Sequence, residues 1–377
     1  MYILKLALCF LSFTGLSQAG LGQIERIWLT HRTNEPSHLV INWQSNKPGN
    51  SEVHYRAGTD KELIIIKKEK TTLHHLEIPL TKMDVIYNYQ VFTEDESSEV
   101  HSFKSYPSGT NELRTAVIGN WAGGGADLSK LMEDKPHILF TLGDNIPNLH
   151  GTCGAGTKDC IEPFLKLIDS NPELFRSIPL MPVLGNHDKE MRPRGQKYPP
   201  EAVYDIDATA YRMFFELPDD EWKWHFKIPD FNICFIALDL NHISDFGTTW
   251  QTCHPFSLDS EQLEWYKGIM KDNSIKYKIT LQNEKNDAMR QQAGGEWQKI
   301  MQQGTAVITG FGHYSERAEV NGFPYFNSSL VHGDEYPDKF SKALYGVKGY
   351  ILITATESSL KIDIKSLDGK VLDSTIR

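Results

Sequence analysis

The first part of the chain shows a β-type pattern of hydrophobic and polar positions. Between about residues 23 and 108, short segments rich in β-branched and aromatic residues are separated by turn residues, with no helical period between them. Leu39, Ile41 and Trp43 recur at every second position and predict one inward face of a strand. Strands at this spacing are typical of a β-sandwich. The predicted strands are residues 24–29, 38–44, 51–56, 71–78, 86–93 and 99–106.

The pattern changes after residue 109. Continuous apolar runs now end in or near glycine and lead into polar loops or helices. Such runs indicate strands that are buried on both faces, as in a layered α/β domain. In these folds the functional side chains gather at the carboxyl ends of the strands. The predicted strands are residues 114–119, 137–143, 179–185, 232–239, 276–281 and 305–310.

The N-terminus has the layout of a signal peptide. Lys5 precedes an apolar run at residues 6–15, and Ser17 and Ala19 supply the small residues of a cleavage site. The run has about ten residues, too few to span a membrane. We therefore expect a secreted, periplasmic or extracellular protein with no membrane span after cleavage. The predicted organisation is a signal peptide at residues 1–19, a β-sandwich at 20–108 and an α/β domain at 109–377.

Composition and charge narrow the class of protein. The chain has 377 residues, of which 40% are hydrophobic and 11% aromatic, enough for two packed cores. Acidic residues outnumber basic ones by 49 to 39, which gives a formal net charge of −10. With no long run of lysine or arginine, nucleic acid is not an expected partner.

Four cysteines follow the predicted cleavage site. Cys153 and Cys160 lie close together in a glycine-rich loop and could form a short disulfide in an oxidising compartment. Cys234 lies in an apolar strand and reads as a buried thiol. Cys253 stands beside His254, but one such pair is weak evidence for a metal, so a free thiol or a disulfide partner is favoured.

Short polar motifs follow the predicted strands of the α/β domain. They are Gly119-Asn120-Trp121, Gly143-Asp144-Asn145, Gly185-Asn186-His187-Asp188, Gln282-Asn283-Glu284, and Gly310-Phe311-Gly312-His313 with Glu316-Arg317. In this order, each after a strand, they resemble the purple acid phosphatases, a branch of the calcineurin-like metallophosphoesterases. The preceding β-sandwich resembles a fibronectin-type-III domain. The resemblance covers nearly the whole mature chain and implies a metallophosphoesterase-like α/β domain, a layered β-sandwich flanked by helices.

The family resemblance also implies a chemistry. Its members hydrolyse phosphate monoesters with two bridged metal ions, iron with a second iron, zinc or manganese. Two adjacent cations activate a water and hold the phosphate oxygens. The expected ligand is therefore phosphate or a phosphorylated small molecule.

Family roles can be carried onto the matching positions. Asp144 stands where a carboxylate bridges both metals, and Asn186 where an amide oxygen binds the second. His313 stands where a histidine binds the first metal. His187 stands at the catalytic imidazole that faces the phosphate, and Arg317 lies where it could contact the substrate.

Four positions depart from the family pattern. Asn120 replaces an aspartate, Pro147 a tyrosinate, Asn283 a histidine and Phe311 a histidine. If Gly312-His313 is aligned instead with the Gly-His of the family's Gly-His-x-His motif, the second histidine of that motif is replaced by Ser315. One histidine ligand is therefore missing in either alignment. Each metal would keep only two of its ligands.

Charge sharpens this conclusion. Asp144 is the one certain carboxylate, and burying a cation without countercharge costs several kcal/mol per ion. We expect no metal, or one that is weakly held. Glu284 is the best substitute carboxylate, although a solvated loop acid is the more ordinary interpretation of it. Further nearby acids are Asp127, Asp188 and Glu316. Asn186 and Asp188 could also simply brace the turn after their strand.

Two hypotheses follow from these residues. The first is a non-hydrolysing relative, a pseudoenzyme whose domain persists as an anion-binding or structural module. The second is an active metal-dependent acid phosphatase with an atypical or mononuclear site.

Overall fold

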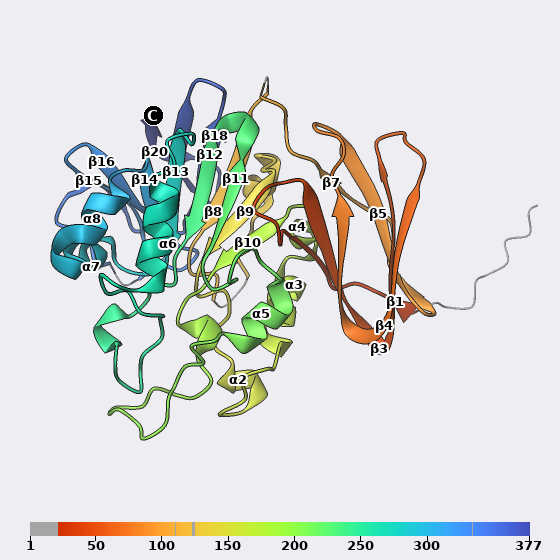
Figure 1. The fold of residues 1–377 in the computed structure, drawn as a ribbon, viewed down its shortest axis with the longest axis horizontal. Helices are drawn as coiled ribbons and strands as arrows, with labels where there is room; N and C mark the ends of the chain where they lie inside the picture. Colours follow the sequence, from red (N-terminus) through yellow and green to blue (C-terminus); the bar gives the residue numbers. More distant parts are fainter. Residues whose placement is uncertain (1–21, 110, 123–124, 334) are drawn as a thin grey trace, which may run out of the picture.

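The computed structural model describes residues 22–109, 111–122, 125–333 and 335–377. The predicted signal peptide lies outside these ranges. One sheet is formed by the N-terminal part of the chain and two by the rest, and the N-terminal sheet stands at one end of an elongated molecule (Figure 1). The arrangement agrees with a β-rich first segment followed by a layered α/β segment.

The N-terminal sheet is organised around one long strand. The sequence pattern predicted separate strands at 38–44 and 51–56, but the chain continues through both, with register shifts between Gln44 and Ser51. The first half of this strand pairs with β2 and the second half with β5. The strands are β1 (Gly22–Gln23), β2 (Ile27–Thr30), β3 (His38–Ala57), β4 (Leu63–Pro79), β5 (Ile86–Thr93), β6 (Glu96–Ser97) and β7 (His101–Lys104).

The six strands predicted after residue 109 are confirmed, with ends that differ by one or two residues. They form two parallel groups, β8-β9-β10 in a six-stranded sheet and β12-β13-β14 in a seven-stranded sheet. Nearly every residue in them is buried, as continuous apolar runs require. They are β8 (Leu113–Ile118), β9 (Ile138–Leu142), β10 (Leu180–Val183), β12 (Ile233–Ala237), β13 (Tyr277–Gln282) and β14 (Ala306–Thr309).

Further strands, which the sequence pattern did not reveal, complete the two sheets. The six-stranded sheet has the order β10-β9-β8-β18-β19-β20, and the seven-stranded sheet β11-β12-β13-β14-β16-β15-β17. The added strands are β11 (Trp224–Ile228), β15 (Ser315–Val320), β16 (Phe323–Asn327), β17 (Ser341–Tyr345), β18 (Gly349–Ala355), β19 (Leu360–Ser366) and β20 (Val371–Ile376).

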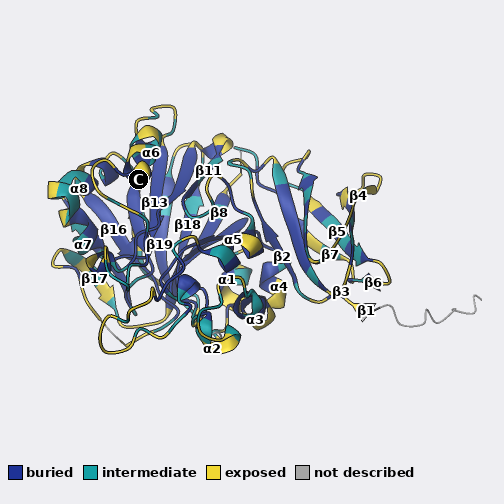
Figure 2. Ribbon diagram, turned by 60° about the horizontal axis from the view of Figure 1, so that its bottom comes forward, coloured by how far each residue is buried: buried dark blue, intermediate teal, exposed yellow. Residues whose placement is uncertain are grey.

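The two sheets pack face to face and helices cover their outer sides (Figure 2). Phe140 of β9 lies 4.4 Å from Phe235 of β12, ring centre to ring centre. On the outer face of the sheet that contains β12, β13 and β14, Tyr266 and Trp297 pack α6 and α8 against the strands. The helices are α1 (Ser129–Glu133), α2 (His150–Cys153), α3 (Glu162–Ser170), α4 (Pro172–Phe175), α5 (Thr209–Phe215), α6 (Glu261–Met270), α7 (Asn286–Gln291) and α8 (Glu296–Met301). Short 3-10 turns are η1 (His187–Lys189), η2 (Pro229–Phe231), η3 (Ile243–Asp245) and η4 (Gln292–Gly295).

Aromatic contacts join the N-terminal sheet to the rest of the molecule. The ring of Trp28 on β2 stacks on Phe214 of α5 with 4.1 Å between centroids. His31 is fully buried, 4.8 Å from the ring of Phe226, and its Nε2 lies 2.8 Å from the Tyr106 hydroxyl. Large aromatic areas of this kind dominate packing energies, so the sheet is held in a defined position.

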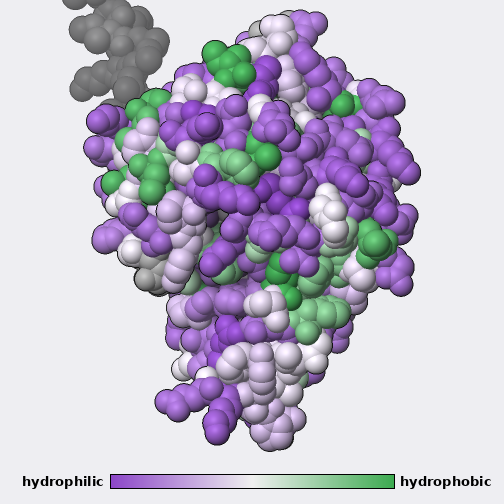
Figure 3. Space-filling view, turned by 90° about the vertical axis from the view of Figure 1, so that its left-hand side faces the viewer, coloured by the Kyte–Doolittle hydropathy of each residue, from purple (hydrophilic) through white to green (hydrophobic). Residues whose placement is uncertain are grey.

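Two surface properties bear on partners. Within the described ranges, no helix is long and apolar enough to cross a membrane. The face on the α7 and α8 side is mostly hydrophilic, with hydrophobic residues in small separate groups (Figure 3). Scattered apolar residues of this kind are normal on a protein surface and do not mark an interface.

Candidate functional site

Glycines at the strand ends allow the segments that carry the predicted site motifs to lie close together. A Cβ on Gly119 would lie 2.4 Å from the Cα of Gly310, and one on Gly143 2.7 Å from the side chain of Asn283. A Cβ on Gly185 would lie 2.3 Å from Asp144 Oδ1. Only residues without a side chain allow such close approach. The carboxyl ends of five strands therefore meet at one place, as the sequence predicted.

Asp144 and His187 form the charged part of this site. Asp144 takes a left-handed backbone conformation with φ of 52°, and its Oδ1 lies 3.4 Å from the backbone nitrogen of His187, which donates to it. The Nδ1 of His187 contacts the carbonyl of Pro147. Burial lowers the pKa of His187, but the Asp144 carboxylate and the Pro147 carbonyl outweigh burial and raise it above its ordinary value.

Two of the substituted positions hold strand ends together. Asn283 is fully buried, and its Nδ2 donates a 2.7 Å hydrogen bond to the carbonyl of Leu142. Its Oδ1 has no hydrogen-bond partner among the described residues. The Nδ2 of Asn120 donates to the carbonyl of Gly312 at 3.3 Å. Both amides thus tie segments together that lie more than a hundred residues apart in sequence.

Phe311 lies beside a histidine that the sequence analysis did not single out. The ring centre of Phe311 is 5.5 Å from that of His242, and Lys285 Nζ is also 5.5 Å from the Phe311 centroid. Burial and Arg194 lower the pKa of His242, and the Asp144 carboxylate opposes them only in part. His242 precedes η3 in a polar loop, so no apolar periodicity or motif marked it.

The carboxylates considered as substitute metal ligands accept hydrogen bonds from backbone nitrogens. Glu284 was expected to be a solvated loop acid, and this was wrong: it is 4% exposed and accepts hydrogen bonds from the backbone nitrogens of Ile243 at 2.8 Å and Lys285 at 2.7 Å. Backbone N–H groups of a buried loop need acceptors, and Glu284 supplies them. Burial raises its pKa.

Asp188 braces the turn after β10, as one of the two interpretations predicted. Its carboxylate accepts from the backbone nitrogens of Gly185 at 2.8 Å and Asn145 at 2.9 Å, and from Asn145 Nδ2 at 2.9 Å. Burial and the neighbouring Asp144 raise the pKa of Asp188 to about 7. Asn186, which precedes it by two residues, is buried as well.

The remaining acids also serve local structure. Glu316 accepts a 2.9 Å hydrogen bond from the backbone nitrogen of Asp338, and burial raises its pKa to about 7. Asp127 accepts from the backbone nitrogen of Ser129 at 2.9 Å, before α1. Each of the four candidate acids accepts a hydrogen bond from a backbone nitrogen.

The last two predicted positions lie on the C-terminal side. His313 is partly buried just before β15, and its backbone carbonyl accepts from Gly333 at 3.3 Å. Arg317 forms an ion pair with Asp373 of β20 at 2.6 Å and contacts Glu319 at 3.3 Å. Its guanidinium is engaged between strands.

The donor chemistry does not fit the two-metal centre that the family implies. Across the described parts of the chain, no group of three or more histidine, cysteine, aspartate or glutamate side chains is arranged to hold a metal ion. Pro147 offers no side-chain ligand, and the amides of Asn120 and Asn283 direct N–H groups at carbonyls. Tight two-metal sites need several anionic and imidazole ligands.

Two of the four described cysteines form a disulfide and two are free. Cys153 and Cys160 form a disulfide that joins α2 to the segment before α3, a pairing that their spacing allowed but did not decide. Cys234 is buried and free, as expected, and Cys253 is a buried free thiol rather than a disulfide partner.

Sequence reasoning missed a buried ion pair beside the site. Lys189, the last residue of η1, contacts Asp239, which follows β12. Asp239 also lies 2.7 Å from His254 Nδ1, and the His254 ring stacks on Trp222 at 3.7 Å. The partners are far apart in sequence, so no local pattern linked them.

Comparisons with known proteins agree with this architecture at the level of the fold. No protein-family profile and none of the curated proteins matches the chain. A solved structure of PhoD has a TM-score of 0.67 at 14% sequence identity, over 94% of this chain and 89% of PhoD. The chain therefore has a PhoD-like, metallophosphoesterase-like fold.

Weaker likenesses carry no argument by themselves. GAP50, the anchor in the inner membrane complex of Plasmodium, matches at 12% identity with a TM-score of 0.43, over 70% of this chain and 88% of that one. A predicted phosphoesterase from Streptococcus pneumoniae matches at 11% identity with a TM-score of 0.30, over 71% and 99% of the two chains.

Proposed function

We propose that this chain is an exported, purple-acid-phosphatase-like protein that no longer hydrolyses phosphate esters. One observation carries the proposal: Asn120 and Asn283 stand at ligand positions, and their amides donate to the carbonyls of Gly312 and Leu142. Each donating amide nitrogen is no metal ligand, and the amide oxygen that remains is a neutral donor in place of the family's aspartate at Asn120 and its histidine at Asn283. The substitutions have turned ligand positions into structural links.

Electrostatics supports the same conclusion. Asp188, Glu284 and Glu316 accept backbone N–H groups at 2.8–2.9 Å, whereas Asp144 accepts a longer bond of 3.4 Å from His187, so Asp144 is the most open of these described carboxylates to a cation. A pair of multivalent cations with a single facing carboxylate would be left largely uncompensated in a buried site. Without a firmly bound metal ion, the chain has no cation to lower the pKa of a water molecule and supply hydroxide at neutral pH.

The proposed remaining role is to bind phosphate or a phosphorylated small molecule at His187. The Nδ1 of this ring donates to the Pro147 carbonyl, so Nε2 donates to an anion when the ring is protonated. The raised pKa of His187 extends the pH range in which the ring is cationic. Pro147 also borders a cavity of about 530 Å³ that has Trp121 and Lys166 in its walls. This cavity can hold the organic part of such a ligand.

The finer domain assignment is part of the proposal. We assign residues 1–19 to a cleaved signal peptide, 20–108 to a fibronectin-type-III-like sandwich and 109–377 to the metallophosphoesterase-type domain. The apolar run near the N-terminus supports the first assignment, and the seven-stranded N-terminal sheet supports the second.

Elemental analysis and an activity assay test the proposal together. Purified protein is analysed for bound metals and assayed on 4-nitrophenyl phosphate with added iron, zinc or manganese. We expect less than one transition ion per chain and no hydrolysis that depends on Asp144, as judged with Asp144→Ala. Two stoichiometric ions would overturn the proposal. One ion with Asp144-dependent turnover would establish the mononuclear phosphatase instead.

Ligand binding is measured separately. Titration calorimetry with inorganic phosphate should give saturable binding that His187→Gln weakens about tenfold, a loss near 1.4 kcal/mol. Equal binding by both proteins would place the anion elsewhere and contradict the proposed role of His187.

A further inference from the structure

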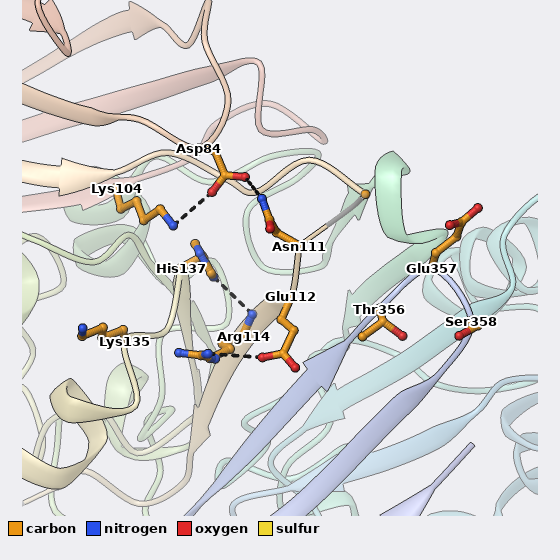
Figure 4. A pocket seen from close by; sticks show the side chains of 11 residues that line it. Asp84, Lys104, Asn111, Glu112, Arg114, Lys135, His137, Thr356, Glu357 and Ser358 are labelled. Carbon is orange, nitrogen blue, oxygen red and sulfur yellow. Dashed lines mark hydrogen bonds and ion pairs between the residues drawn. The ribbon is translucent and has the colours of Figure 1, made fainter.

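A second cavity lies at the opposite ends of the strands from His187. Its volume is about 780 Å³, and it opens between the N-terminal sheet and the α/β part of the chain (Figure 4). Arg114 in its wall stands at the start of β8, whereas Asn120 follows the end of that strand. Six residues of strand span about 20 Å, so the two sites are separate.

Three parts of the chain build the cavity. Asp84 and Lys104 come from the N-terminal sheet and its loops, and Arg114 and His137 from the beginnings of β8 and β9. The turn between β18 and β19 closes the other side. The remaining described residues of the wall are Gly109, Asn111, Glu112, Lys135, Thr356, Glu357 and Ser358. None of these described residues has an aliphatic side chain and His137 supplies their one aromatic ring, so the cavity favours a polar ligand over a lipid chain.

Positive and donor groups gather on one side of the cavity. Lys104, Arg114 and Lys135 lie around His137 (Figure 4). The backbone nitrogen of Arg114 donates to His137 Nδ1 at 3.2 Å, which places the ring proton on Nε2. Burial, with the nearby Lys104 and Arg114, lowers the pKa of His137 to about 4, so the ring is a neutral N–H donor. Lys135 forms no ion pair with any residue that the structure describes.

Acceptors gather on the other side. Glu357 stands at the tip of the β18–β19 turn, is exposed, and has no ion-pair partner in the described part of the chain. Thr356 and Ser358 flank it with hydroxyl groups, as Figure 4 shows. Glu112 contacts Arg114 at 3.2 Å and closes the gap between the two sides. The cavity thus offers cations and an N–H donor opposite the carboxylate of Glu357 and the hydroxyl of Ser358.

The balance of charge narrows the ligand class. The cations Lys104, Arg114 and Lys135 are matched by Asp84, Glu112 and Glu357, so the cavity has no large net charge. A polyanion such as nucleic acid would need a clear positive excess. A ligand with one anionic group and several hydroxyls satisfies both sides, because the anion meets Lys135 and the hydroxyls donate to Glu357.

We propose that this cavity binds an acidic saccharide, a sugar unit that carries one carboxylate or sulfate. Its acidic group lies between Lys135, Arg114 and the Nε2 of His137. Its hydroxyls donate to Glu357 and exchange hydrogen bonds with the hydroxyl of Ser358, since the Thr356 hydroxyl is bonded to Ser359. The volume falls within the range of about 300–1,000 Å³ usual for small-ligand sites, enough for a disaccharide.

Titration calorimetry with a defined panel tests this site. The probes are digalacturonate, cellobiouronate, and sulfated and unsulfated chondroitin disaccharides, with galactobiose as the neutral counterpart of the first. We expect at least one acidic probe to bind about tenfold more tightly than galactobiose. Lys135→Asn should remove most of that difference, and asparagine tolerates the left-handed φ of 52° at this position.

Two more variants complete the experiment. Glu357→Gln should weaken acidic and neutral probes alike, because it weakens the acceptor for hydroxyls. Lys271→Asn is the matched control, since Lys271 is exposed at the end of α6 outside the cavity and should leave binding unchanged. The proposal is overturned if no acidic probe binds saturably, if galactobiose binds equally well, or if Lys135→Asn behaves like the control.

Discussion

Lys189 Nζ lies 2.7 Å from Asp239 Oδ1, and both side chains are completely buried. The pair links the turn after β10 to the end of β12, next to the candidate site. Burial raises the pKa of Asp239, but Lys189 and His254 outweigh it and lower the pKa to about 2. Each charge is therefore tolerated in the interior only because the other is present.

Removing one partner of this pair should strongly destabilise the fold. Lys189→Met leaves Asp239 buried without its countercharge, and we expect a loss of about 3–5 kcal/mol in the free energy of unfolding. Urea denaturation measures the change. Lys267→Met is the control, because Lys267 pairs with Glu264 on an exposed helix face and should cost less than about 1 kcal/mol. Similar losses in the two variants would contradict the prediction.

Glu316 should make stability depend on pH. Burial raises its folded-state pKa to about 7, above the unfolded value of about 4.3. The folded chain therefore holds this proton more tightly, and the contribution of Glu316 is complete below about pH 4 and is lost as the pH rises towards 7. Glu316→Gln, which is neutral throughout, should gain stability relative to the natural chain between pH 5 and pH 8. Urea unfolding at both pH values tests this, and a constant difference would refute it.

The disulfide between Cys153 and Cys160 should stabilise the loop that carries α2. It closes a short loop, for which chain entropy gives about 2–3 kcal/mol. We expect the double variant Cys153→Ala/Cys160→Ala to lose about this amount in urea unfolding. Dithiothreitol should lower the stability of the natural chain similarly and leave the variant unchanged. An effect of the reductant on the variant would show that another bond is responsible.

Restoring lost ligands should restore metal affinity. The double variant Asn120→Asp/Phe311→His adds a carboxylate and an imidazole at positions that converge with Asp144. We expect zinc or manganese to bind at least about tenfold more tightly than to the natural chain. Calorimetry with each ion measures this.

The matched control is Asn321→Asp/Phe340→His, which makes the same exchanges at exposed positions. Metal binding that rises equally in both double variants would mean that the strand-end site is not responsible.

The sequence alone determined the layered arrangement of this protein. Apolar runs such as those ending at Gly119 and Gly143 cannot be solvated, so they had to become buried strands with their polar motifs at one edge. The close spacing of Cys153 and Cys160 made a disulfide possible from local information, and the structure shows that bond. The sequence pattern did not predict β3 as one continuous strand, because its hydrophobic alternation is interrupted where the register shifts.

Only the tertiary structure decided what the polar residues do. Glu284 is a backbone acceptor rather than a solvated acid because the nitrogen of Ile243, distant in sequence, folds against it. Asn283 meets the carbonyl of Leu142, and Lys189 meets Asp239, by the same long-range packing. The partner of a buried polar group depends on which segments the folded core brings together. A hydrophobic pattern records burial but not that choice of partner.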